Sequence, residues 1–145
     1  MKTDDLVIEM TYNTPITNVW SAITNVDKMK SWYFQLEEFK PKVGFNFDFI
    51  AGPKDGIQYL HLCEVTEVLE GTKITYSWRY DNYPGNSLVT WALFDKGEQT
   101  LLRLTHAGIH TLEEGGPDFT KENCARGWNH FVHTALKDYL ESEVK

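Results

Sequence analysis

The fold of this protein is decided by residues 74–106, which read ITYSWRYDNYPGNSLVTWALFDKGEQTLLRLTH. Apolar and polar side chains alternate in three short runs of this stretch. The side chains of one face are Ile74, Tyr76 and Trp78, then Val89, Trp91 and Leu93, then Leu102, Leu104 and His106. Turn-forming residues separate the runs at 82–86 and 95–98. Period-two alternation with such short loops predicts three neighbouring antiparallel strands.

The same pattern continues upstream of residue 74. Phe45, Phe47 and Phe49 occupy alternate positions, and residues 59–68 form a further alternating run. Loop signals lie at 52–56 and 70–73. The whole region from about residue 36 to 110 therefore predicts an antiparallel meander with one apolar face, and that face needs a cover.

The N-terminal segment predicts one strand and two short helices. Residues 6–12 alternate from Ile8 onward. Thr14 is expected to cap a helix of about ten residues, with Pro15 at its first position. Asp27 is expected to cap a second short helix that carries Met29 and Trp32.

The C-terminal segment predicts the cover. Asp118 or Thr120 is a suitable N-cap, and the chain then runs without proline to about Ser142. At 100° per residue one face gathers, within roughly 80°, Cys124, Trp128, Phe131, Ala135 and Tyr139, with Val132 beside them. The opposite face holds Arg126, His130, His133 and Lys137. The prediction is an α+β fold in which a curved antiparallel sheet wraps around one long C-terminal helix.

Composition excludes several classes of protein. The 145 residues suit a single domain spanning 1–145, and 41% hydrophobic with 24% charged residues is typical of a folded chain. A net charge of −7 argues against nucleic-acid binding. No run of about 18 apolar residues and no signal-peptide pattern occur, so we expect a cytoplasmic protein without membrane insertion. Cys63 and Cys124 are expected to be reduced thiols.

Aromatic residues make up 14% of the chain, and many fall on the inner faces of the predicted sheet and helix. Such side chains either fill a core or wall a ligand cavity. The candidate cavity-lining residues are Trp32, Phe47, His61, Tyr76, Trp78, Trp91, His106, Trp128 and Phe131. His61 and His106 are the two polar members. Each is either a structural imidazole or a group that orients a ligand or acts as acid or base.

Other candidates for chemistry are weak. His130 and His133 have helical i, i+3 spacing, which can chelate a metal, but they fall on the polar face without a third ligand in the nearby sequence. The two cysteines lack an activating neighbour. We therefore assign no catalytic residue, metal site or cofactor from the sequence.

Four segments in order carry a resemblance to a known family: residues 15–24, residues 63–68 with 74–78, residues 104–108, and Gly127-Trp128. The chain resembles the SRPBCC superfamily, and within it the subfamily related to the C-terminal domain of the activator of heat-shock protein 90 ATPase. The resemblance covers nearly the whole chain. It implies the helix-grip fold of START domains, with a cavity between the long helix and the sheet.

The resemblance also implies three functions. The first is non-catalytic binding of a small hydrophobic or aromatic ligand. The second is an enzyme of the cyclase, dehydratase or hydrolase type that uses His106 or His61. The third is a protein-interaction role of co-chaperone type, with a chaperone as partner. We favour the first, because the aromatic inner faces support it independently.

Overall fold

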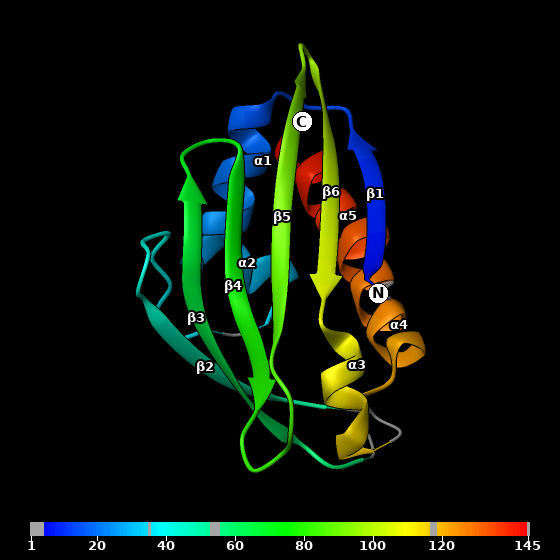
Figure 1. The fold of residues 1–145 in the computed structure, drawn as a ribbon. Coiled ribbons are helices and arrows are strands. Elements are labelled where there is room, and N and C mark those ends of the chain that lie inside the picture. Colours follow the sequence, from blue (N-terminus) through cyan, green and yellow to red (C-terminus); the bar gives the residue numbers. More distant parts are fainter. Residues whose placement is uncertain (1–4, 35, 53–55, 117–118, 145) are drawn as a thin grey trace.

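The computed structural model describes residues 5–34, 36–52, 56–116 and 119–144. The strands are β1 (Leu6–Tyr12), β2 (Asn46–Ala51), β3 (Tyr59–Leu69), β4 (Lys73–Tyr80), β5 (Ser87–Lys96) and β6 (Gln99–Ala107). The helices are α1 (Ile16–Thr24), α2 (Val26–Trp32), α3 (Ile109–Leu112), α4 (Lys121–His130) and α5 (Leu136–Val144). A 3-10 turn, Glu113–Gly115, follows α3, and a π-helical turn, Phe131–Ala135, joins α4 to α5 (Figure 1).

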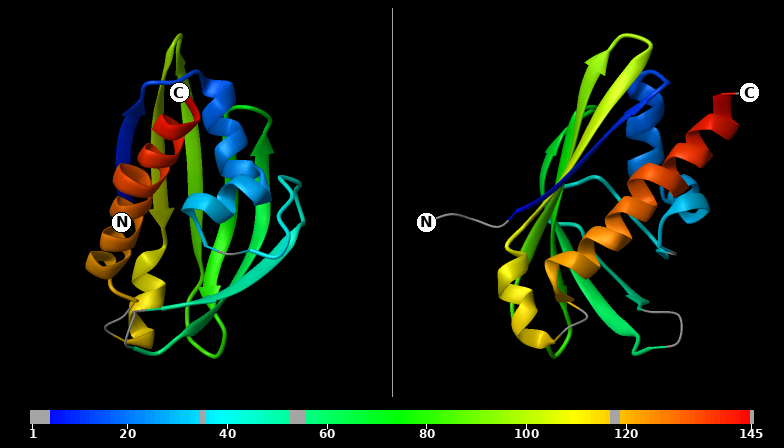
Figure 2. Two further views of the ribbon diagram at one scale, coloured as in Figure 1. Left: turned by 180° about the vertical axis from the view of Figure 1, so that it is seen from behind. Right: turned by 90° about the vertical axis from the view of Figure 1, so that its right-hand side faces the viewer.

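The six strands form one antiparallel sheet in the order β1-β6-β5-β4-β3-β2. The pairing of β3 with β4 shifts register between Val65 and Glu67. Such a bulge bends a strand and increases its twist, and the sheet is visibly curved in side view (Figure 2). The α+β helix-grip prediction is confirmed.

The helices α1, α2 and the α4–α5 segment lie on the same face of the sheet (Figure 2). The predicted caps of the two short helices are wrong by one or two residues. Helix α1 has Pro15 itself at the N-cap. Helix α2 is capped by Asn25, whose side-chain oxygen accepts from the Lys28 amide at 3.1 Å, while Asp27 lies in the first turn. An Asx side chain just before the helix reaches that amide, and one inside it cannot.

The C-terminal helix begins after Thr120, whose hydroxyl accepts from the Asn123 amide; Asp118, the other predicted cap, lies outside the described residues. The buried residues of the helix are Trp128, Val132, Leu136 and Leu140. This row differs from the predicted stripe, in which Cys124, Phe131, Ala135 and Tyr139 are only half-buried. Three steps of four residues would drift by roughly 120° around a regular α-helix. The wider π-helical turn absorbs part of that drift.

The π-helical turn is attached to the first strand. The Tyr12 hydroxyl donates to the Val132 carbonyl oxygen at 2.6 Å, and Nε2 of His133 donates to the Glu9 carbonyl oxygen at 2.9 Å. These bonds hold the helix against β1 at one edge of the sheet.

Helix α3 was not predicted from the sequence. It packs against the β4–β5 loop, where Gly85 has φ of +98° and a Cβ there would lie 2.2 Å from the Thr111 carbonyl oxygen. Only glycine fits such a position. None of the helices within the described residues has the length and apolar character needed to span a bilayer.

Candidate functional site

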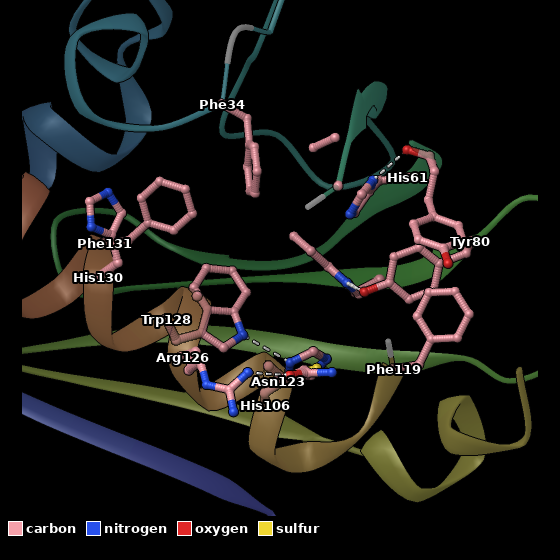
Figure 3. Close-up of a pocket in the computed structure, with 16 residues that line it drawn as sticks. Phe34, His61, Tyr80, His106, Phe119, Asn123, Arg126, Trp128, His130 and Phe131 are labelled. Atoms are coloured by element: carbon pink, nitrogen blue, oxygen red, sulfur yellow. Dashed lines mark hydrogen bonds between the residues drawn. The ribbon is translucent and has the colours of Figure 1, made fainter. Parts of the chain in front are cut away.

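A cavity of about 550 Å³ lies between α4 and the inner face of the sheet (Figure 3). Strands β2, β3, β4 and β6 and the segments beside them contribute Ala51, Gly52, Tyr59, His61, Trp78, Tyr80 and His106. The C-terminal helix contributes Asn123, Cys124, Arg126, Gly127, Trp128, His130 and Phe131, and Phe34 and Phe119 complete the lining. The volume lies within the roughly 300–1,000 Å³ that small-molecule sites occupy.

The nine predicted lining residues divide into two groups. Those that line the cavity are His61, Trp78, His106, Trp128 and Phe131. The other four, Trp32, Phe47, Tyr76 and Trp91, are buried in the packed core and are not among the lining residues.

The short helix α2 explains this division. It places Trp32 with its ring centroid 5.7 Å from that of Trp91, and the following Tyr33 at 6.0 Å from Trp91. The Tyr33 and Tyr76 hydroxyls are hydrogen-bonded at 2.8 Å, and the Trp91 indole donates to the Tyr76 oxygen at 2.9 Å. This half of the space between sheet and helix is therefore filled, and the cavity occupies the other half.

His106 is fully buried, and both of its ring nitrogens are hydrogen-bonded. The Trp128 indole N–H donates to Nδ1 at 3.0 Å, and Nε2 lies 2.8 Å from the Ser87 hydroxyl oxygen. An indole can only donate, so Nδ1 carries no proton and Nε2–H is the donor to Ser87. The Ser87 hydroxyl in turn donates to the Trp78 carbonyl oxygen at 2.7 Å.

This chain of bonds fixes His106 as a neutral imidazole. A second proton on Nδ1 would face the indole N–H, and burial lowers the pKa of His106 to about 3. The side chain therefore serves as a structural imidazole, held by side chains rather than by the backbone.

His61 is 5% exposed and is held by aromatic rings. Its ring stacks on Phe49 at 4.5 Å and makes T-shaped contacts with Tyr80 at 4.7 Å and Trp78 at 5.1 Å. Nδ1 lies 3.0 Å from the Tyr59 carbonyl oxygen, which can only accept, so Nδ1 carries the hydrogen. Burial lowers the pKa of His61 to about 4, although the nearby backbone of Tyr59 and Phe49 acts in the opposite direction.

The free nitrogen of His61 faces the cavity. Nε2 lies on the side of the ring away from Tyr59 and points into the space between the sheet and the helix (Figure 3). Every fully buried side-chain nitrogen and oxygen of the described residues has a hydrogen-bond partner. The unpaired Nε2 is thus an acceptor that the cavity leaves accessible.

Tyr80 contributes a hydroxyl to the same wall. Its oxygen accepts from the Trp78 indole N–H at 3.0 Å, and burial raises the pKa of Tyr80 well above its usual range. The hydroxyl keeps its own hydrogen, because the phenol is not ionised at neutral pH.

The helix side of the cavity carries a row of polar side chains. Asn123, Arg126 and His130 have i, i+3, i+7 spacing, and all three line the cavity. Nη1 of Arg126 donates to Oδ1 of Asn123 at 2.7 Å. His130 and His133, predicted to share a polar face, are directed differently, because His133 bonds to β1 instead.

The thiols are poorly suited to nucleophilic chemistry. Burial raises the pKa of Cys124, which lines the cavity, to about 11, and raises the pKa of Cys63 still further. Both cysteines are free. The described residues contain no group of three or more His, Cys, Asp or Glu side chains arranged to hold a metal ion.

Several lining residues were missed by the sequence reasoning. Tyr59 and Tyr80 share strand faces with His61 and Trp78, so period-two alternation would have found them. The spacing of Asn123, Arg126 and His130 was a readable helical signal. Phe119 lies just before α4, and no local pattern marks it.

The curved sheet that grips a long C-terminal helix defines a helix-grip protein of the SRPBCC superfamily. The family model for Activator of Hsp90 ATPase homolog 1-like proteins matches residues 13–141, so the chain belongs to that family. No curated protein matches the chain significantly.

Solved structures share the fold at low identity. DynU16, from the dynemicin biosynthetic locus, is 23% identical with a TM-score of 0.77 over 97% of this chain, which spans only 48% of DynU16. CalU16 from Micromonospora echinospora is 22% identical with a TM-score of 0.71, over 98% of this chain and 79% of that one. Mll3558 from Rhizobium loti is 18% identical with a TM-score of 0.80, over 95% and 97% of the two chains.

Proposed function

We propose that this protein binds a small hydrophobic or aromatic ligand, without turnover, in the cavity between the sheet and α4. The observation that carries the proposal is the 550 Å³ cavity itself, whose walls are mainly aromatic rings. Burial of an apolar ligand against such walls contributes roughly 25 cal/mol for each Å² removed from water. A few polar groups at the wall then orient the ligand.

The polar groups of the cavity favour binding over catalysis. His106 has no free nitrogen to take a proton from a substrate, since Trp128 and Ser87 occupy both. The low pKa of His61 makes it a weak base, and the raised pKa of Cys124 keeps its thiol protonated.

The five tryptophans allow a direct test. Trp78 and Trp128 line the cavity, and their indole N–H groups donate to Tyr80 and His106, which also line it. The indole N–H groups of the other three tryptophans, Trp20, Trp32 and Trp91, donate to Glu70, Ala22 and Tyr76, which do not line it. Their five side-chain signals in a ¹H–¹⁵N NMR spectrum therefore report on the cavity and on the rest of the protein separately.

We would titrate the full chain with naphthalene, a medium-chain fatty acid and dynemicin, the last because DynU16 belongs to the dynemicin locus. Saturable shifts are expected at Trp78 and Trp128, with much smaller ones at Trp20, which serves as the internal control. The proposal fails if no probe moves the two cavity signals up to its solubility limit.

A further inference from the structure

Nε2 of His61 belongs to a largely buried, rigid side chain, borders the cavity and has no hydrogen-bond partner within the part of the chain that the structure describes. The His61 side chain is more than nine-tenths buried. It stacks on Phe49 and makes T-shaped contacts with Tyr80 and Trp78. The ring therefore has little freedom to turn Nε2 toward water.

The hydrogen bond on the other ring nitrogen decides what Nε2 can do. Because Nδ1–H donates to the Tyr59 carbonyl oxygen, the neutral ring presents a lone pair at Nε2. A lone pair accepts a hydrogen and repels a carbonyl or ether oxygen. The site thus distinguishes a ligand that can donate from one that can only accept.

His106 shows by contrast that this property is specific to His61. Its Nδ1 lone pair is already used by the Trp128 indole, and its Nε2–H by Ser87. The two inward-facing histidines of the sheet therefore differ in role. Both ring nitrogens of His106 are hydrogen-bonded within the protein, whereas Nε2 of His61 is available to a ligand in the cavity.

We propose that the cavity selects aromatic ligands that carry a hydroxyl group, and that this hydroxyl donates its hydrogen to Nε2 of His61. The inference rests on the proposed function, because it assumes that the ligand enters this cavity. An aromatic ring suits the neighbouring walls, to which Phe34, Trp78 and Trp128 contribute their rings. A ligand without a donor would leave a desolvated lone pair unpaired, which binding sites discriminate against.

The test compares 2-naphthol with 2-methoxynaphthalene, which has the same rings and oxygen but no hydrogen to donate. Calorimetry on the full chain is expected to give a Kd for 2-naphthol about tenfold lower, the size of one buried hydrogen bond. His61→Phe keeps an aromatic ring next to Phe49 and removes the nitrogens, so the ratio of the two Kd values should fall to about one. His110→Phe, the same change at an exposed histidine of α3 outside the cavity, should keep the ratio.

A second measurement on the unmodified protein covers the case in which His61→Phe does not fold. Long-range ¹H–¹⁵N correlation detects the unprotonated Nε2 of a neutral histidine, and its signal should move upfield with 2-naphthol but not with 2-methoxynaphthalene. Equal affinities with an unmoved Nε2 signal would overturn this inference and leave cavity binding intact. Failure of both probes to bind or to move the Trp78 and Trp128 signals would remove the proposed function as well.

Discussion

Mild acid is expected to destabilise the protein through its two buried histidines. In the unfolded chain both titrate at the ordinary pKa of 6.5, and in the folded chain the pKa of His106 is about 3 and that of His61 about 4. Between those values the unfolded chain binds protons that the folded chain does not. Stability is therefore complete above about pH 6.5 and falls as the pH drops toward the folded values.

The size of the effect follows from the same values. At pH 5 the solution is about 1.5 units below the ordinary pKa, and each unit corresponds to about 1.4 kcal/mol, so each histidine costs about 2 kcal/mol. The two together should lower the free energy of unfolding by about 4 kcal/mol between pH 8 and pH 5. A natural domain has roughly 5–15 kcal/mol in total, so the change is easily measured.

The assay is urea unfolding followed by tryptophan fluorescence at pH 8, 7, 6 and 5. His106→Asn keeps an acceptor for the Trp128 indole, and His61→Asn keeps a donor for the Tyr59 carbonyl. Each is expected to be less stable at pH 8 but to lose about 2 kcal/mol less on acidification. His110→Asn, at an exposed position on α3, is the control and should follow the unmodified protein. If both buried-site variants lose as much stability as the unmodified protein, the account of the neutral imidazoles is wrong.

Three further changes test the site. Gly127→Leu places a side chain into open space at the cavity. The higher helix propensity of leucine should raise the free energy of unfolding by about 0.8 kcal/mol and Tm by about 2–4 °C. Calorimetry should show weaker naphthalene binding, because the new side chain occupies part of the cavity. A variant that is less stable than the unmodified protein, or that binds naphthalene equally well, would contradict the position of Gly127 at the cavity. Trp128→Phe leaves Nδ1 of His106 unpaired and should cost about 1–3 kcal/mol in urea unfolding, and a neutral result would argue against that bond. Arg126→Gln should weaken 2-naphthoate binding about two- to fivefold at low salt and leave naphthalene binding unchanged; an equal effect on both ligands would exclude a charge contribution.

Local patterns predicted the elements well, and the errors are instructive. Alternation allowed both His61 and His106 to point inward, although Leu60 and Leu62 competed with His61 for the inner face, and both histidines are buried. The predicted buried face of the C-terminal helix was wrong, because the prediction assumed a rotation of 100° per residue throughout and the helix contains a π-helical turn. That turn is held by Tyr12, whose partner lies 120 positions away in the sequence.

Sequence patterns are sufficient to predict the antiparallel meander, the helix that covers it and the aromatic character of the space between them. These depend on the spacing of apolar residues, which acts within one strand or one helix. Tertiary packing sets which aromatic side chains fill that space and which border a cavity. Trp91 and Trp78 have the same pattern in the sequence, but Trp32 and Tyr33 of the α2 region pack against Trp91. Trp78 contacts Trp128 of α4 instead and borders the cavity. These contacts join segments far apart in the chain, so no local pattern reports them.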